Sequence, residues 1–252
     1  MEIRRLKPDP VTVDVEALLD GLAWGEDLPP GRPRLALNMI ATLDGKAALG
    51  GRTRGMGNAA DRLLFHGLRA RADAVMVGAG TARVERYGRL VRDPAARARR
   101  SAAGLAPDPL ACVVSGRLDL PADLPLLEDT GSRVLVSTCA NRELAPGGAA
   151  VEYFRQTSSE LRPLLDALRG QHQVSTVLCE GGPTLNAQLL SEGLVDELFL
   201  SLSPKVVGGA AAPTIVAGAP PLEIVDLDLV WCLESEGHLF NRYRLRRGER
   251  AA

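Results

Sequence analysis

The segment Cys-Glu-Gly-Gly-Pro-Thr-Leu-Asn at 179–186 is the clearest candidate for chemistry. A β-branched apolar run at 174–178 precedes it and predicts a buried strand, and leucines at helical spacing follow it. Glycines at such a corner let a ligand approach the backbone, and the free N–H groups at the start of a helix attract phosphate. Glu180 then lies beside the bound group. The segment therefore predicts a phosphate-binding turn next to a carboxylate, although Gly-Gly-Pro by itself is also typical of a plain tight turn.

A second glycine turn, Gly-Ala-Gly-Thr at 78–81, follows the apolar run 74–77. Two strands of one sheet that both end in glycine turns favour one extended ligand across the sheet edge, such as a dinucleotide. The turn begins like the Rossmann fingerprint, but Arg83 occupies the position of the third glycine. The sequence therefore predicts a nucleotide site of another kind.

A third group, Thr-Leu-Asp-Gly-Lys at 42–46, follows the first strong strand. In an extended segment Asp44 and Lys46 point the same way, so they can share a proton or a ligand. An Asp-Gly turn beside a surface lysine explains the same residues equally well. The position favours function, because ligands of α/β sheets bind where the strands end.

Composition excludes several classes of protein. The chain has 252 residues, 46% of them hydrophobic, and a net charge of −1, which indicates an ordered globular protein without broad affinity for nucleic acid. No apolar run approaches the ~20 residues that span a bilayer, and the amino terminus lacks a signal peptide. The four cysteines are widely spaced, as expected of buried thiols in a cytoplasmic protein, and the three histidines have no metal-ligand spacing. We expect no metal site and no membrane partner.

The pattern along the chain alternates between strands and helices. We expect helices at 13–22, 58–71 and 159–169, and strands at 34–41, 74–77, 110–115, 133–137, 151–154, 174–179 and 196–203. Two further strands, at about 222–234 and 238–246, have no helix between them and predict an antiparallel hairpin. Residues 42–57 are expected to form a loop, and residues 93–108 an exposed excursion. This order predicts an α/β fold: a mixed sheet with helices on both faces.

Five separated blocks together resemble a known family. They are residues 42–46, 77–81, 180–185, 193–198 and 204–209. In this order and spacing they are similar to the riboflavin-pathway pyrimidine reductases, the reductase half of the bifunctional deaminase-reductase. The resemblance covers about residues 34–246 and implies a dihydrofolate-reductase-like fold with a mostly parallel central sheet. It implies one reductase domain over 1–252, with 1–33 as an amino-terminal extension. The zinc deaminase motifs are absent from this chain, which suggests a stand-alone reductase of the actinobacterial type.

The resemblance implies an oxidoreductase that uses NADPH. Its expected reaction is reduction of a ribosylamino-pyrimidine 5′-phosphate to the ribitylamino compound, by hydride transfer to the C1′ imine of the opened sugar. Two alternatives stay open: a reductase of another substrate such as a dihydropterin or dihydrofolate, and an NADP-binding protein without turnover. The resemblance also implies a homodimer, for which the apolar strand 198–202 and the closing hairpin could supply the contact.

The resemblance assigns roles to individual residues. Asp44, Lys46 and Glu180 are the expected catalytic groups, the first two as acid and relay. The expected cofactor-binding residues are Thr42, Gly78, Gly80, Thr81, Glu85, Ser115, Gly181, Gly182, Pro183, Thr184, Leu185 and Asn186. The expected substrate-binding residues are Thr53, Arg69, Arg89, Arg92 and Glu180, with arginine chosen because its planar fork binds phosphate oxygens in pairs.

Two positions depart from the family pattern. After the second glycine turn the family usually carries Asp-Asp-Pro, whereas this chain has Glu85-Arg86-Tyr87. In the loop before Asn58, Gly55 occupies a position that is often aromatic in the family. Both changes lie where the pyrimidine and the nicotinamide are expected to meet, so they bear on the identity of the substrate.

Overall fold

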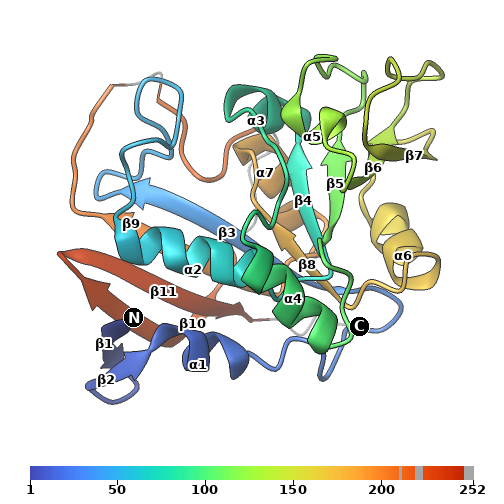
Figure 1. Ribbon diagram of the computed structural model, residues 1–252. Coiled ribbons are helices and arrows are strands. Elements are labelled where there is room, and N and C mark those ends of the chain that lie inside the picture. Colours follow the sequence, from blue (N-terminus) through green and yellow to red (C-terminus); the bar gives the residue numbers. More distant parts are fainter. Residues whose placement is uncertain (210–211, 219–223, 247–252) are drawn as a thin grey trace, which may run out of the picture.

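A computed structural model describes residues 1–209, 212–218 and 224–246. Within this part, the eleven strands form one mixed sheet of order β2-β1-β10-β11-β9-β3-β8-β4-β5-β6-β7 (Figure 1). The strands are β1 (Glu2–Lys7), β2 (Val11–Asp14), β3 (Arg34–Thr42), β4 (Ala74–Gly78), β5 (Leu110–Val114), β6 (Arg133–Thr138), β7 (Ala150–Arg155), β8 (Thr176–Cys179), β9 (Glu197–Ser203), β10 (Leu227–Ser235) and β11 (His238–Leu245). The helices are α1 (Val15–Asp20), α2 (Ala59–Arg69), α3 (Ala79–Val84), α4 (Pro94–Ala102), α5 (Pro125–Glu128), α6 (Arg162–Gly170) and α7 (Pro183–Ser191).

Seven consecutive strands of the sheet, from β9 to β7, are mutually parallel. Their carboxyl ends therefore lie along one edge of the sheet, where β3, β8 and β4 are direct neighbours. The predicted sites after β3, β8 and β4 thus share one rim, as the sequence indicates. The mostly parallel α/β sheet with a closing β10–β11 hairpin confirms the predicted fold class.

Alternate residues of the parallel strands pack on opposite faces of the sheet. Val75 and Val77 face a cluster that includes α1 and α2, whereas Ala74 and Met76 face a cluster that includes α6 and α7. The near-continuous apolar runs follow from this burial on both sides. On the α6–α7 face, Cys112, Met76 and Cys179 stand side by side across β5, β4 and β8. Burial raises the pKa of both thiols to about 12.

The amino-terminal segment, expected as an extension before the residues that resemble the family, pairs with the sheet. β1 pairs antiparallel with β10, and β2 pairs with β1. Trp24 lies edge-on to Phe199 with ring centroids 5.6 Å apart, and its indole N–H donates to Glu197. The strands escaped prediction because charged and polar residues alternate irregularly in 2–14. The predicted helix at 13–22 is present in shorter form as α1.

Residues 93–108 contain a helix where the sequence predicts an exposed excursion. Asp93 caps α4, because its carboxylate accepts from the backbone N–H groups of Ala95 and Ala96. Pro94 stands in the first turn, where its missing N–H costs nothing. Arg100 is buried and donates to the carbonyls of Ala70 and Ala72. The arginines that suggest a solvated loop therefore include one that anchors this helix.

The edge strands of the sheet are β2 and β7. The apolar strand 198–202 lies within β9, which pairs with β11 and β3 on its two sides, and β10 and β11 are also paired on both sides. These strands therefore have no free edge for pairing with a second copy, and a dimer contact through them would use their faces. The hairpin begins at Leu227, and residues 222–223 of its predicted first strand lie outside the described residues. None of the described helices is long and apolar enough to span a membrane.

Candidate functional site

A cavity of about 440 Å³ opens at the rim, between α2, the turn after α3 and the ends of β3, β8 and β9. Six lining residues come from two turns of α2, so this helix forms one wall of the cavity. Its ionisable lining residues are Arg54, Asp61, Arg62, His66, Arg69, Glu85, Arg86, Tyr87, Arg92 and Glu180. Such a mixture of charges in a concave site suits a polar, anionic ligand.

Glu180 is the centre of a buried cluster at one end of this cavity. Its two carboxylate oxygens accept from Nε and a terminal nitrogen of Arg69, each at 2.7 Å. The Tyr87 hydroxyl donates to the same carboxylate. The Arg69 guanidinium lies 4.2 Å from the centroid of the Phe65 ring. Burial and the negative charge of Glu180 raise the pKa of the Tyr87 hydroxyl well above its usual value, so the phenol keeps its proton.

Arg69 and Tyr87 both bind Glu180, a contact that the sequence does not predict. Arg69 is predicted to hold the substrate phosphate, but its side chain is buried and bound to Glu180. Tyr87, which departs from the family pattern, donates a hydrogen bond to Glu180. Arg86 lines the cavity and pairs with Asp123, which does not line it. Glu180 itself lies in the cavity as predicted. With three donors on its carboxylate, it is arranged as an acceptor and suits an acid role poorly.

Asp44 and Lys46 do not form the predicted proton relay in this structure. The Asp44 carboxylate accepts from Thr42 Oγ1 and from the backbone N–H groups of Val207 and Gly208. These hydrogen bonds lower the pKa of Asp44 to about 2, so it has no proton to donate near neutral pH. Neither Asp44 nor Lys46 lines the cavity. The side chain of Thr42 also accepts from the Lys46 N–H, and all three residues thus fix the turn after β3.

The two glycine turns touch one another at the rim. The Gly78 N–H donates to the Gly181 carbonyl at 2.7 Å. A Cβ on Gly182 would lie 2.6 Å from Thr81 Oγ1, and Gly181 has a φ of +80°, so the approach requires glycine at both positions. Neither α3 nor α7 has a side-chain cap at its amino end. The turns therefore present backbone N–H groups beside the cavity, as a phosphate site requires.

The other predicted cofactor residues divide into two groups. Pro183 and Thr184 form the first turn of α7, and Gly80 has open space where a Cβ would be. Asn186 is fully buried and donates to the Ile215 carbonyl, and Leu185 packs in the core. These two side chains support the turn and are not exposed to a ligand. Thr42 and Ser115 are buried at the ends of β3 and β5, with Ser115 Oγ accepting from the Asp119 N–H.

Three arginines line the cavity without an ion pair among the described residues: Arg54, Arg62 and Arg92. A Cβ added to Gly88 would lie 3.4 Å from a terminal nitrogen of Arg92, so the Arg92 side chain passes close to Gly88. Arg89, also predicted to bind substrate, instead pairs with Asp108 and lies outside the cavity lining. The sequence thus identifies Arg92 correctly as a cavity residue, and it misses Arg54 and Arg62, which read as ordinary surface charge.

The loop before α2 is tied to the turn after α3. The Thr53 N–H donates to a carboxylate oxygen of Glu85 at 2.7 Å, and both residues line the cavity together with Thr81. The predicted substrate residue Thr53 and the predicted cofactor residues Glu85 and Thr81 are therefore brought together. This contact places the proposed substrate and cofactor regions side by side.

Asp61 is a cavity residue that the sequence analysis did not select as functional. It stands in the first turn of α2, where a carboxylate is also expected simply to favour the helix start. The structure places it in the cavity wall beside Ser201 and Gly57. Burial raises its pKa, although the Ser201 hydroxyl and His238 act in the opposite direction.

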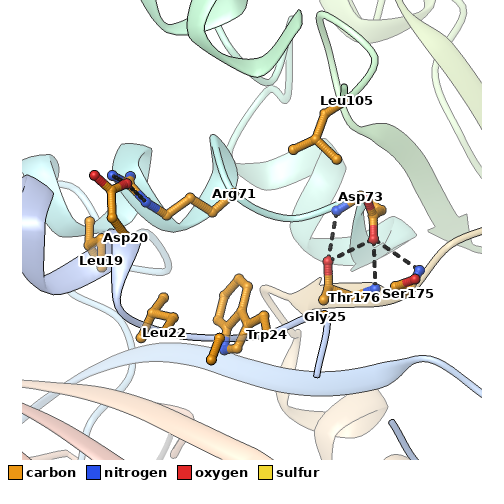
Figure 2. Close-up of a pocket in the computed structure, with 11 residues that line it drawn as sticks. Leu19, Asp20, Leu22, Trp24, Gly25, Arg71, Asp73, Leu105, Ser175 and Thr176 are labelled. Atoms are coloured by element: carbon orange, nitrogen blue, oxygen red, sulfur yellow. Dashed lines mark hydrogen bonds and ion pairs between the residues drawn. The ribbon is translucent and has the colours of Figure 1, made fainter. Parts of the chain in front are cut away.

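Another hollow, of about 370 Å³, lies at the amino ends of β4 and β8, opposite the rim cavity (Figure 2). Its main carboxylate, Asp73, accepts from the N–H groups of Ser175 and Thr176 and from the Thr176 hydroxyl. A third hollow, of about 520 Å³, lies between α1, α2 and α4, where Arg71 pairs with Glu16 and Asp20. The charges named here are bound to the protein itself, so the rim cavity is the stronger candidate site.

The sheet and the rim cavity define a class of protein: an α/β protein with a polar cavity at the carboxyl ends of its parallel strands, where ligands of such sheets bind. The chain belongs to the RibD C-terminal domain family, whose model matches residues 33–237. This finding confirms the resemblance deduced from the sequence blocks.

Individual relatives agree with the family. A 2,5-diamino-6-ribosylamino-4(3H)-pyrimidinone 5′-phosphate reductase of Archaeoglobus fulgidus is 33% identical over 192 residues, covering 74% of this chain and 87% of that protein. A reductase of the same name from Methanothermobacter thermautotrophicus is 31% identical over 203 residues, covering 77% and 88%. The crystal structure of a pyrimidine reductase-like protein from Corynebacterium diphtheriae matches with a TM-score of 0.76 at 26% identity, covering 93% of this chain and all of that one.

Proposed function

We propose that this protein is an NADPH-dependent reductase of a ribosylamino-pyrimidine 5′-phosphate, acting in riboflavin biosynthesis. The observation that carries the proposal is the junction of two glycine turns beside a cavity that holds Glu180 and arginines without an ion pair in the described part of the chain. The relatives named as pyrimidinone 5′-phosphate reductases support the same substrate class.

The turns fit the phosphates of a nicotinamide dinucleotide. The amino end of α7 offers backbone N–H groups without a competing side-chain cap, and Gly182 has no side chain to block the approach. When bound, the dihydronicotinamide supplies a hydride; the chain's residues hold the donor and acceptor in place. Arg117 is exposed just after β5, on the same rim. We assign it to the 2′-phosphate that distinguishes NADPH from NADH.

The cavity fits a phosphorylated aminopyrimidine. Arg54, Arg62 and Arg92 supply positive charge for the 5′-phosphate, in place of the buried Arg69. The Glu180 carboxylate, fixed by Arg69 and Tyr87, can accept from an amino or hydroxyl group of the substrate. A dihydropterin carries no phosphate that the three arginines could bind. The 5′-phosphate therefore distinguishes the proposed substrate from a dihydropterin. The homodimer remains part of this proposal, with strand 198–202 and the closing hairpin contributing through their side chains, since their backbone edges are already paired.

The test is NADPH oxidation at 340 nm with the diamino- and the deaminated ribosylamino-pyrimidine 5′-phosphates, beside dihydrofolate and NADH. We expect turnover of a pyrimidine, and a rise in its KM in Arg92→Ala. Arg89→Ala is the matched control, because Arg89 is bound to Asp108 away from the cavity. Tight NADPH binding without turnover of either pyrimidine would refute the proposal.

A further inference from the structure

The reaction proposed above requires one proton. Reduction of the C1′ imine adds a hydride to carbon and a proton to nitrogen, while the C=N π pair becomes the new N–H bond. A positioned acid near the nitrogen assists this step. The structure indicates which cavity group can hold that proton, because it shows the hydrogen bonds and ion pairs that each ionisable group already makes.

Three carboxyl groups line the cavity: Asp61, Glu85 and Glu180. Glu180 accepts from Arg69 and Tyr87, and Glu85 accepts from the Thr53 N–H. Asp61 has no ion pair among the described residues, although Arg62 lies next to it in the sequence. Glu85 also has no ion pair among the described residues, but its carboxylate is bound to the backbone of the neighbouring loop, whereas burial raises the pKa of Asp61.

The other titratable groups of the cavity suit the role less well. The Tyr87 hydroxyl donates its one proton to Glu180. Burial and the charge of Arg69 lower the pKa of His66, so its ring is neutral near pH 7. Arginines keep their protons at any working pH.

The surroundings of Asp61 hold it in the cavity wall. A Cβ on Gly57 would lie 2.0 Å from Asp61 Oδ2, so the carboxyl group packs directly on the Gly57 backbone. Ser201 on β9 and His238 on β11 face it from the sheet, and Arg62 flanks it on α2. The His238 ring is itself bound to the Met56 carbonyl at 3.0 Å. Asp61 lies eight residues before Arg69 on α2, about 12 Å along the helix axis. The two groups thus lie at different levels of the same cavity wall.

We propose that Asp61 is the catalytic acid of this site and transfers its proton to the imine nitrogen of the substrate. The carboxylate that remains recovers a proton from solvent after each turnover. This inference depends on the proposed function for its substrate, and it adds a role for a residue outside the five sequence blocks.

Kinetics of Asp61→Asn give the first test. We expect kcat to fall about 100-fold or more, in the range of general acid catalysis, with the Kd for NADPH unchanged. In the unaltered protein kcat should fall as pH rises through the elevated pKa of Asp61, and Asp61→Asn should lose this dependence. Ser201→Ala removes a group that lowers this pKa, so it should move the fall in kcat to higher pH. Asp166→Asn, on the surface of α6, is the control.

A second variant moves the carboxyl group and keeps it. Gly57→Ala places a methyl group where Asp61 Oδ2 now lies, and Gly57 has no left-handed φ that alanine would strain. We expect its kcat to fall while the protein folds normally. Full activity in both Asp61→Asn and Gly57→Ala would overturn the inference.

A readout without substrate separates this inference from the proposed function. Because the native pKa of Asp61 is raised, its proton stabilises the folded state fully below the unfolded pKa, about 3.9. That contribution is lost as pH rises through the native pKa. The stability of Asp61→Asn relative to the unaltered protein should therefore increase over this interval. A difference independent of pH would refute the inference even if no pyrimidine is turned over, whereas inactivity toward pyrimidines alone contradicts only the proposed function.

Discussion

At the scale of single residues, Glu180 shows how a buried charge can be held in a fixed orientation. Its side chain and that of Arg69 are respectively 3% and 10% exposed, so little water screens the pair. A buried ion pair of this kind gains little over apolar residues, but removing one partner leaves an uncompensated charge. The pair therefore fixes the direction of a polar group in the cavity more than it stabilises the fold.

Arg69→Met tests this interpretation. We expect the free energy of unfolding to fall by about 3–5 kcal/mol, because Glu180 is left buried and unpaired. Replacing both residues with methionine should recover much of this loss. Arg162→Met is the control: Arg162 forms an exposed pair with Asp166, whose loss costs at most about 1 kcal/mol. Urea denaturation measures all three variants, and equal losses for Arg69→Met and Arg162→Met would contradict the argument.

Tyr87→Phe removes one donor from Glu180 and leaves the ring in place. Loss of a hydrogen bond to a charged group predicts a fall in stability of about 1.5–3 kcal/mol, together with a lower kcat/KM for the pyrimidine. Tyr153→Phe is the matched control, because Tyr153 lies on the edge strand β7, away from the cavity, and its hydroxyl accepts from the Leu144 N–H. It should lose stability and keep its activity. Unchanged kcat/KM in Tyr87→Phe would show that Glu180 needs only Arg69.

Residue roles were less predictable from sequence than residue positions. The resemblance assigns Glu180, Arg92, Thr53 and Thr81 to substrate or cofactor, and in the structure all four line one cavity. It assigns Arg69 to phosphate because the partner that occupies it, Glu180, is 111 positions away. Asp61 was missed because a carboxylate in the first helical turn has an ordinary explanation. Contacts between residues far apart in the sequence decide these roles, and the local sequence pattern contains no information on such contacts.

At the scale of elements, the site depends on two strand-to-helix turns that meet. β4 and β8 are adjacent and parallel, which brings Gly78 and Gly181 within hydrogen-bond distance. The sequence predicts both turns, because glycine and proline have strong local preferences. It does not predict α4, because the cap at Asp93 and the buried Arg100 act through contacts beyond the local window.

Gly182→Ala tests the junction of the turns. The added Cβ would meet Thr81 Oγ1 at 2.6 Å, so the turns must separate. We expect a stability loss of about 1–3 kcal/mol, as for overpacking, and a weaker Kd for NADPH by about tenfold or more. Gly170→Ala, at the end of α6 with open space around it, should change neither quantity for the worse. Fluorescence titration with NADPH measures the affinity, and an unaltered Kd would contradict the assignment of the turns to the cofactor.

At the scale of the whole molecule, the amino-terminal segment closes the antiparallel half of the sheet. It contributes Ile3, Val15, Leu19, Leu22 and Trp24 to the main core. Each fully buried side chain of this kind is worth about 1.5–3 kcal/mol, and the net stability of a domain is only about 5–15 kcal/mol. The segment is therefore required for folding, although the family blocks begin only after it.

Deletion of residues 2–25 should abolish the folded state at 25 °C. The deletion also exposes the edge of β10, which favours association between copies. Circular dichroism and sedimentation measure both effects. Trp24→Phe is the milder companion, since it removes only the hydrogen bond to Glu197 and part of the ring; it should fold and lose about 1–3 kcal/mol. A folded, monomeric deletion variant would show that the antiparallel half is dispensable.

The pairing of β1 with β10 has a consequence for the order of synthesis. β1 is made first, but its partner ends at Ser235, so the amino-terminal strands must wait while some 230 residues are translated. At ribosomal speeds this interval lasts roughly 10–50 s. During that time the parallel half can already assemble around β4 and β5, whereas β3 stays without β8 and β9 on its two sides. The nascent chain thus carries β1 with an unpaired edge through most of its translation, and this edge stays open to pairing with another chain until β10 is made.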